Sequence, residues 1–276
     1  MYSSDKDFIA KESDHRKLNP AVSVVMSIYN GENFIERSIE SISKQTYSNY
    51  EIVIVDDGST DKSSLILDKL LNGNHIDLLI RNNLNIGLTK SLNIGVALSN
   101  GFLIARQDVD DISYKNRLLV QTKFIDDYDL IGGLAATVYA NNMKKIIFGE
   151  KENSKNIMEM VFLENPFVHS SVMFRKEVFN RLGGYNEDFK VSQDFELWMR
   201  FAEVGKIGKM NTVVVERMVH DQMISRKASL KQLYYSNKAR FMHPHTGYIK
   251  PIIYGFKQMS AFFVPRFIKE IIKKLL

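Results

Sequence analysis

The 276-residue sequence contains no cysteine. This absence excludes a disulfide framework, a thiolate nucleophile and a cysteine-ligated metal, and it fits a protein of the reducing cytosol. No run of about 18 apolar residues occurs, so no membrane-spanning helix is expected. Residues 1–20 lack the basic start and the apolar core of a secretory signal. A cytoplasmic protein is therefore expected.

Two glycine-rich phosphate-binding motifs are also missing. Neither Gly-x-Gly-x-x-Gly nor Gly-x-x-x-x-Gly-Lys occurs, which weighs against a dinucleotide-dependent dehydrogenase and a P-loop enzyme. The sequence has no internal repeat and no low-complexity linker. Its content of 45% hydrophobic and 25% charged residues is that of an ordinary globular protein. The length suits one large domain, or one domain with an appendage.

The net charge of +5 comes from one end of the chain. Residues 249–276 hold six lysines and arginines against the single Glu270, while the rest is balanced and gives no sign of nucleic-acid binding. In this tail, aromatic and aliphatic residues alternate with cations, which is typical of a helix in a bilayer interface. We therefore expect 223–276 to be a helical, basic, amphipathic region in peripheral contact with the inner face of the cytoplasmic membrane. Packing on the body or on another subunit is the alternative, and no feature specifies an oligomeric state.

The first part of the chain alternates predicted strands with predicted helices. Short apolar runs predict strands within 21–30, 51–57, 76–80 and 102–105, and helical periodicity predicts helices within 32–45, 62–71 and 87–100. This alternation predicts an α/β sheet of parallel strands with right-handed crossovers. Ligands bind such sheets beyond the carboxyl ends of the strands.

Beyond residue 112 the pattern is looser. It predicts a helix at 114–128, a hairpin at 134–149, a short helix at 156–164, a strand at 166–175, a helix at 194–204 and a strand at 212–219. We expect one domain at 20–222, with halves at 20–111 and 112–222. The polar residues 1–19 before it are expected to be a flexible extension.

Three aspartates, Asp108, Asp110 and Asp111, follow the fourth predicted strand. Two like charges roughly 4 Å apart repel by on the order of 4 kcal/mol at an effective dielectric of 20. A divalent cation would reverse the sign of this cost, and carboxylate oxygens suit Mg²⁺ or Mn²⁺. The alternative is an acidic loop that caps the next helix. The turn "VDDGST" leaves a similar choice between ordinary turn chemistry and an aspartate that accepts a ligand N–H, such as that of uracil.

Five blocks of the sequence occur in the order of a known family. They are "VSVVMSIYNGENFIERSIESISKQTYSNYEIVIVDDGSTD", "NIGLTKSLNIGVALSNGFLIARQDVDD", "NPFVHSSVMFRK", "GGYNEDFKVSQDFELWMR" and "ERMVHDQMIS". Across about 20–225 the chain resembles family 2 glycosyltransferases with the GT-A fold. The resemblance implies a Rossmann-like, mostly parallel sheet flanked by helices, with 20–111 as the nucleotide-binding half and 112–222 as the acceptor-binding half. It also implies inverting transfer of a sugar with Mn²⁺ or Mg²⁺.

The resemblance assigns roles to individual residues. Ser27 and Asp57 match positions that contact the nucleotide base, Tyr29 and Asn30 lie beside them, and Arg81 is grouped with them because it follows the third strand. Asp108 matches a residue on the ribose side, Asp110 a metal ligand, and His220 a histidine that completes the metal or diphosphate site. Asp194 matches the general base, for which helix capping is the alternative.

Four residues are possible supports of this site. Asp111 either assists the other aspartates or caps a helix. Gln193 stands where the family often has glutamate. His169 and Trp198 are expected in the core, with a direct role for His169 and acceptor stacking for Trp198 as alternatives.

The expected function is inverting, metal-assisted transfer from a nucleotide sugar, in particular a UDP-sugar. The acceptor would be a carbohydrate carried on a lipid, as in O-antigen or capsule synthesis. A sugar nucleotidyltransferase is one alternative, although its glycine-rich start before a catalytic lysine or arginine is absent. A non-catalytic carbohydrate-binding or assembly homologue, which Gln193 would permit, is the other.

Overall fold

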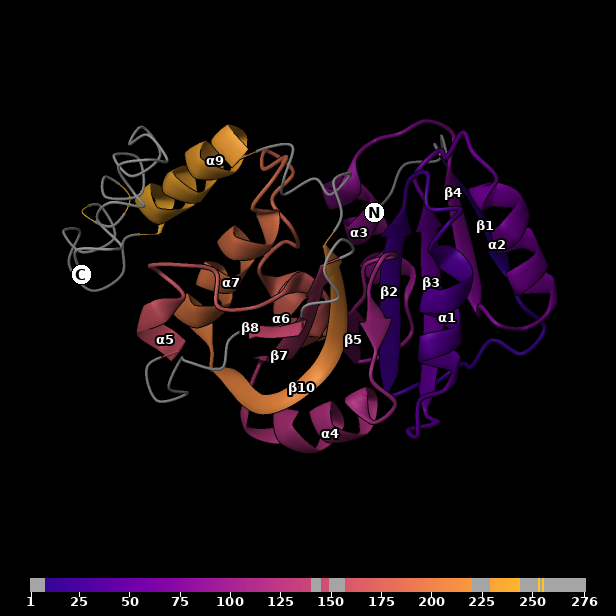
Figure 1. The fold of residues 1–276 in the computed structure, drawn as a ribbon, viewed down its shortest axis with the longest axis horizontal. Helices are drawn as coiled ribbons and strands as arrows, with labels where there is room; N and C mark the ends of the chain where they lie inside the picture. Colours follow the sequence, from indigo (N-terminus) through magenta and orange to yellow (C-terminus); the bar gives the residue numbers. More distant parts are fainter. Residues whose placement is uncertain are drawn as a thin grey trace.

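The structure, a computed structural model, describes residues 8–139, 145–148, 157–219 and 229–243, together with Ile253 and Gly255. Within these residues, one ten-stranded mixed sheet runs through the molecule with helices on both faces (Figure 1). The strand order is β1-β4-β3-β2-β5-β9-β7-β10-β6, and β8 pairs with β7.

The parallel part of the sheet confirms the predicted alternation. Its strands are β2 (Val22–Ile28), β3 (Tyr50–Asp56), β4 (Leu78–Asn82) and β5 (Leu103–Arg106), and its crossover helices are α1 (Ile35–Ser43), α2 (Ser63–Asn72) and α3 (Leu88–Leu98). β2 lies between β3 and β5 and is parallel to both, and β4 is parallel to β3. Every residue of β2 is buried, because helices cover both faces of a parallel sheet.

The second part adds antiparallel pairings. Its elements are β6 (Ile112–Ser113), α4 (Arg117–Phe124), the 3₁₀ helix η1 (Ile125–Asp127), β7 (Leu130–Tyr139), β8 (Lys145–Phe148), α5 (Ile157–Met160), the 3₁₀ helix η3 (His169–Ser171), β9 (Val172–Arg175), α6 (Lys176–Arg181), α7 (Gln193–Val204), β10 (Ile207–Val219) and α9 (Ser229–Met242). β9 is antiparallel to both β5 and β7 and so joins the two parts. The hairpin predicted at 134–149 is confirmed by the β7–β8 pairing.

The two faces of the sheet carry separate cores. On one face, Ile39 of α1, Leu67 of α2 and Leu118 of α4 pack together. On the other face, Leu92 of α3 packs in a larger cluster with Trp198 of α7. Because side chains alternate along a strand, successive residues at a strand end point into different layers.

The N-terminal prediction was wrong for residues 8–12. Phe8–Glu12 form β1, which pairs antiparallel with β4 at the edge of the sheet. Arg16 anchors the following segment: its Nε lies 3.1 Å from the buried Glu51 carboxylate, and its Nη2 donates to the Leu98 carbonyl at 2.7 Å. Backbone pairing of β1, packing of Phe8 against the core and the Arg16 contacts therefore place this segment in the domain.

The predicted helical region after residue 222 is described only in part. α9 lies in it, whereas the basic tail falls outside the described residues apart from Ile253 and Gly255. In the parts of the chain that the structure describes, no helix is both long and apolar enough to cross a membrane. Peripheral membrane contact stays a prediction.

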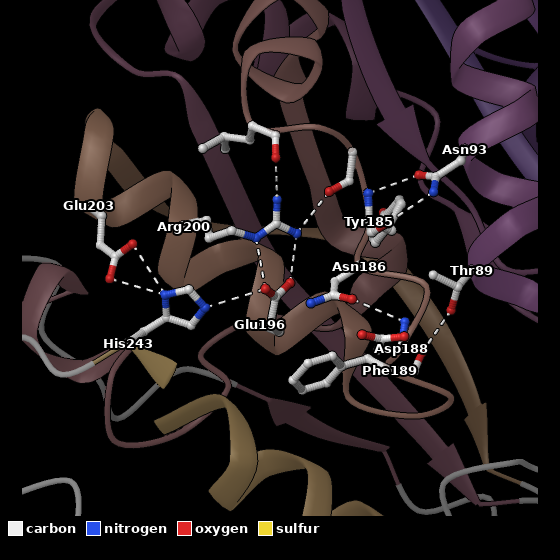
Figure 2. A network of polar contacts seen from close by, with 12 residues as sticks. Thr89, Asn93, Tyr185, Asn186, Asp188, Phe189, Glu196, Arg200, Glu203 and His243 are labelled. Carbon is white, nitrogen blue, oxygen red and sulfur yellow. Dashed lines mark hydrogen bonds and ion pairs between the residues drawn. The ribbon is translucent and has the colours of Figure 1, made fainter. Parts of the chain in front are cut away.

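The residue that follows α9 ties this helix to α7. Nε2 of His243 lies 3.3 Å from the Glu196 carboxylate, and its Nδ1 lies 3.1 Å from that of Glu203 (Figure 2). Arg200 also binds Glu196, at 2.6 Å. Burial alone would lower the pKa of His243, but hydrogen bonds and charges of the two glutamates outweigh it and raise the pKa.

A pH dependence of stability follows from His243. A folded-state pKa above the unfolded value of about 6.5 means that the stabilisation is complete below about pH 6.5 and is lost as pH rises through the folded value. We expect His243→Gln to lower Tm by about 2–4 °C near pH 5.5 and by much less near pH 8.5. Scanning calorimetry of both proteins at the two pH values measures this. An equal loss at both values would contradict a role for the protonated imidazole.

Candidate active site

The carboxyl ends of β2, β3, β4 and β5 meet at one edge of the sheet, and polar residues gather there. Asp57, which follows β3, is almost completely buried and holds the turn before α3. Its Oδ1 accepts from the Asn82 side chain and the Ile86 N–H, both at 2.9 Å, and its Oδ2 accepts from the Gly87 N–H at 2.9 Å. Three of about four acceptor positions on the carboxylate are therefore used within the protein.

Arg81 lies on the opposite face from Asn82. Its Nη1 donates to Asp68 at 3.0 Å, its Nη2 donates to the Ser64 carbonyl at 2.7 Å, and its Nε lies 3.6 Å from Asp56. All three partners lie in α2 or at the end of β3. The guanidinium therefore fastens α2 to the sheet, and this geometry gives no support to the prediction that Arg81 contacts the donor. Asn82 was not predicted as a site residue, yet it contacts Asp57.

The loop after β2 is linked to the "VDDGST" turn. Asn30 has a left-handed backbone (φ 54°), and its side-chain oxygen accepts the Thr60 N–H at 2.8 Å. Its own N–H donates to Ser59 Oγ at 3.0 Å. Ser27 is buried at the end of β2, and Tyr29 is half exposed. The residues predicted beside the nucleotide base thus share one loop cluster, with Tyr29 accessible.

Arg106 at the end of β5 neutralises Asp108. The guanidinium is 1% exposed, and its Nη2 lies 2.5 Å from Asp108 Oδ1. Ser170, from η3, contacts Oδ2 of Asp108 at 3.0 Å and accepts the Asp108 N–H at 3.0 Å. Burial alone would raise the pKa of Asp108, but Arg106, His169 and the Ser170 hydrogen bond outweigh it and lower the pKa.

The pKa of Asp111 shifts in the opposite direction from that of Asp108. Burial raises the pKa of this carboxyl well above its ordinary value, and the charges of Asp108 and Asp110 add to the effect. Its Oδ2 lies 2.5 Å from Ser170 Oγ, while its buried Oδ1 has no hydrogen-bond partner among the described residues. A hydroxyl has a single proton, so Ser170 can bond both carboxyls only if one of the two holds a proton, and the raised pKa favours Asp111 over Asp108. The contacts of Arg106 and Ser170 thus lower the repulsion that was predicted between these carboxyls.

Buried and half-buried polar side chains bind the backbone carbonyls of this aspartate loop. Gln107 donates to the Asp111 carbonyl at 2.8 Å. Arg117, which is 1% exposed, donates to Gln107 at 2.8 Å and to the Arg106 carbonyl at 2.7 Å. Arg37 of α1 donates to the Asp110 carbonyl at 2.9 Å. The backbone on both sides of Asp110 is therefore fixed.

Asp194 lies in the first turn of α7, where the helix dipole favours a carboxylate. Its Oδ2 accepts the Asn165 side-chain N–H at 2.7 Å. Ser192, which directly precedes α7, has a left-handed backbone (φ 59°), a conformation that costs a non-glycine residue about 1–3 kcal/mol and that clusters at functional sites. Gln193 is buried, so the residue that replaces the family's glutamate does not face the solvent.

The loop before α7 is clamped from two sides. Asn93 of α3 exchanges two hydrogen bonds with the Tyr185 backbone, at 2.8 and 3.0 Å (Figure 2). On the other side, Arg200 donates to the carbonyls of Leu182 and Gly184, each at 2.8 Å. These contacts fix the segment around Tyr185 between α3 and α7.

His169 lies in η3 rather than in the predicted strand, which begins only at Val172. Its Nε2 lies 2.8 Å from the Tyr185 hydroxyl. Burial lowers the pKa of His169 to about 4, with Arg106 adding to the effect, while the charges of Asp108 and Asp194 oppose it. The imidazole is therefore neutral near pH 7 and lies within electrostatic reach of both carboxylates.

Trp198 packs behind this histidine. Its ring is completely buried, lies 6.0 Å from the His169 ring in an edge-to-face arrangement, and makes a similar contact with Phe167 at 6.5 Å. The core alternative fits this position, and a buried ring cannot stack on an acceptor in this conformation. His220 lies outside the described residues.

The structure thus brings Asp108, Asp110, Asp111, His169 and Asp194 into one region. Sequence reasoning missed Arg106, Ser170, Asn165 and Tyr185, although all four stand inside the quoted blocks and Ser170 directly follows His169. Among the described residues, no group of three histidines or acidic residues is arranged to hold a metal ion.

Comparisons with known proteins agree with this arrangement. The sequence profile of glycosyl transferase family 2 matches residues 23–183. EpsE of Bacillus subtilis (strain 168), a protein named as a glycosyltransferase, is 31% identical over 91% of this chain and 94% of its own length. Hyaluronan synthase of Pasteurella multocida is 26% identical over 84% of this chain but only 23% of its own length.

Two solved structures have a similar fold. S. aureus TarS 1–349 in complex with UDP has a TM-score of 0.64 at 20% identity, covering 84% of this chain and 68% of that one. The mannosyltransferase PcManGT from Pyrobaculum calidifontis, in complex with GDP-Man and Mn²⁺, has a TM-score of 0.61 at 16% identity, covering 98% and 83%. The predicted GT-A fold is confirmed by this likeness together with the helix-flanked mixed sheet. The chain is a member of glycosyl transferase family 2, and it is a glycosyltransferase.

Proposed function

We propose that the protein transfers a sugar from a nucleotide donor to a carbohydrate acceptor in a single, inverting displacement. The observation that carries this proposal is that η3 joins the aspartate loop to α7: its Ser170 contacts Asp108 at 3.0 Å, and its His169 packs 6.0 Å from Trp198, one turn after Asp194. The end of β5 and the residues after it provide carboxylates and a buried arginine that suit binding of the donor. Asp194 of α7 provides a carboxylate that suits the role of general base.

The donor would lie over the carboxyl ends of β2–β5. Asp57 and Ser27 would face the base, and Asp108, held by Arg106 and Ser170, would orient the ribose. A UDP-sugar is the first choice, because a uracil N–H can reach the remaining acceptor position on Asp57. The UDP-bound TarS structure supports a uridine nucleotide and the GDP-Man complex supports guanosine, so both belong in the test.

A divalent cation fits the residues after β5. Asp110 offers hard carboxylate oxygen atoms, and the buried Oδ1 of the neighbouring Asp111 has no hydrogen-bond partner among the described residues. Asp110 would hold Mn²⁺ or Mg²⁺, with His220 as a further ligand. The cation would offset the charge that develops on the departing diphosphate.

Asp194 would act as the general base. An acceptor hydroxyl is a weak nucleophile until its proton is removed, and a carboxylate at hydrogen-bonding distance can take that proton as the new bond forms. Oδ1 of Asp194 would receive it, since Oδ2 is bonded to Asn165. The new bond to the anomeric carbon forms as the bond to the diphosphate oxygen breaks.

The most direct test of the nucleotide class is a thermal-shift screen of UDP-, GDP- and TDP-sugars with Mn²⁺. Ligand at about 100-fold above Kd stabilises by about 2.7 kcal/mol, or roughly 5–10 °C in Tm for a domain of this size. A shift with one nucleotide class supports the proposal, and the absence of a shift with all of them contradicts it. The alternative of a sugar nucleotidyltransferase is not favoured, given the family match.

We further propose a lipid-linked acceptor of surface polysaccharide synthesis, reached from the inner face of the cytoplasmic membrane. Relatives named hyaluronan synthase and chondroitin synthase make polysaccharides, which supports this class of product. The six cations of residues 249–276 support contact with anionic lipid.

Membrane contact can be tested by truncation. Removal of the chain after residue 245 should weaken binding to anionic vesicles about tenfold or more, because each cation near the surface contributes about 1 kcal/mol. Co-sedimentation with vesicles containing phosphatidylglycerol measures this, and phosphatidylcholine vesicles serve as the control. Equal binding of the truncated and full-length proteins would contradict the proposal.

A further inference from the structure

Asn165 and Asp194 form a pair whose geometry is fixed from both sides. Asn165 Nδ2 donates to Asp194 Oδ2 at 2.7 Å, and the Asn165 side-chain oxygen accepts the Phe167 N–H at 3.2 Å. Since a backbone N–H must meet the oxygen of the amide, the amide cannot flip, and its NH₂ group faces the carboxylate. No other hydrogen bond to the Asp194 carboxylate is found in the described part of the chain.

The ring of Phe167 is itself fixed in place. It packs so closely on Gly132 of β7 that a Cβ there would lie 2.1 Å from it, so no other residue fits. It also makes the edge-to-face contact with Trp198 of α7. The turn that carries Asn165 is therefore pressed between the sheet and the helix that carries Asp194.

A buried arginine of α9 contacts both the segment that carries Asn165 and the segment that carries Asp194. Arg240 is 4% exposed, and its Nε and Nη2 donate to the Leu163 carbonyl at 2.9 and 2.6 Å. Its guanidinium also lies 5.2 Å from the centre of the Phe195 ring. Leu163 precedes Asn165 by two residues and Phe195 directly follows Asp194. One cation thus contacts both segments of the pair.

We infer that Asn165 is a positioning residue for Asp194, and that Arg240 keeps the two segments in register. This inference rests on the proposed function, in which Asp194 is the base. With Oδ2 held by Asn165, Oδ1 is the atom that takes the proton of the acceptor hydroxyl while the acceptor oxygen bonds to the anomeric carbon. The electron pair of the broken bond leaves with the nucleoside diphosphate.

The test compares Asn165→Ala and Asn165→Asp with the wild-type protein. The reaction is hydrolysis of the UDP- or GDP-sugar that stabilises the wild-type protein most in the screen above, with Mn²⁺ and water as acceptor. We expect Asn165→Ala to lower kcat by about 10- to 100-fold with the donor KM unchanged. A carboxyl at position 165 can donate to Asp194 only while it holds a proton. The ratio of the Asn165→Asp rate to the Asn165→Ala rate should therefore rise as pH falls, whereas a merely structural role predicts a constant ratio.

Arg240→Met tests the inferred role of Arg240, with Arg175→Met as a matched control. Arg175 also clamps main-chain carbonyls, those of Tyr128, Ile125 and Asp126, but it lies in β9 and does not contact the pair. Both substitutions should lower Tm. Only Arg240→Met should also lower kcat, by about tenfold, with the donor KM unchanged.

The outcomes separate the inference from the proposed function. If Asp194→Asn is inactive while Asn165→Ala keeps the wild-type kcat or shows a pH-independent ratio to Asn165→Asp, the positioning role is overturned and the base stands. If Arg240→Met and Arg175→Met have equal kcat, the role of Arg240 is overturned. If Asp194→Asn itself is fully active, the base assignment and the inference fail together.

Discussion

Asp194→Asn should lower the turnover number for sugar transfer by about 10²- to 10⁴-fold, because an amide cannot accept the acceptor's proton. The substitution should preserve the hydrogen bond and the position of residue 194. An asparagine oxygen can still accept the Asn165 N–H, and the residue stays in the first turn of α7. Donor affinity should stay within about twofold of the wild-type value, since the base contacts the acceptor and not the nucleotide.

Glu203→Gln is a suitable control for Asp194→Asn. Glu203 lies in the last turn of the same helix and bonds His243, so its loss affects packing of α9 but not the reacting atoms. Steady-state kinetics with the preferred donor, and calorimetric titration of its nucleotide, separate the two effects. Near-normal turnover of Asp194→Asn would rule out this residue as the base.

The second large effect is expected for Asp110→Ala. If Asp110 holds the cation, the gain in nucleotide affinity that Mn²⁺ provides should fall by about 100-fold or more. The Arg106–Asp108 pair and the Ser170 contacts do not involve the Asp110 side chain, so the loop should keep its fold.

Calorimetric titration of UDP or GDP, with Mn²⁺ and with EDTA, measures the effect of Asp110→Ala. The exposed Asp127 of η1 provides a matched control, because Asp127→Ala removes an aspartate that lies outside the loop after β5. Unchanged nucleotide affinity of Asp110→Ala in the presence of Mn²⁺ would exclude Asp110 as the metal ligand.

The parallel half of the sheet could be predicted because its signals are local. The run Val22–Ile28 is buried on both faces. A short, nearly continuous apolar run of this kind is typical of a strand in a parallel sheet. Once those strands were assigned, the position of Asp108, Asp110 and Asp111 at a strand end followed. Arg81 was instead predicted among the donor-binding residues, whereas strand alternation turns it away from Asn82 and toward Asp56 of the neighbouring strand.

The partners of the site residues could not be predicted, because their contacts join distant segments. Ser170 reaches Asp108 across 62 positions and Asn165 reaches Asp194 across 29. Arg106 looked like one more polar residue after an apolar run, and only the structure reveals it as buried. β1 was missed for another reason: an edge strand is held by backbone hydrogen bonds, and its side chains from Ile9 to Glu12 are largely exposed.

The different environments of Asp108 and Asp111 were equally hidden in the sequence. Three neighbouring aspartates suggest three similar charges, yet burial raises the pKa of Asp111, while Asp108 beside it is paired with Arg106 and has a lowered pKa. Only the spatial arrangement distinguishes Asp108, as a charged and fixed acceptor, from its neighbour.

The central claim is that the loop after β5 and the start of α7 form one site for metal-assisted sugar transfer. Release of nucleoside diphosphate from UDP- and GDP-sugars tests it most directly, measured for the wild-type protein, Asp110→Ala and Asp194→Asn. The account predicts release by the wild-type protein that stops with EDTA, resumes with added Mn²⁺, and falls by about 100-fold or more in both variants. Release at the wild-type rate in both variants, or release unaffected by EDTA, would contradict it.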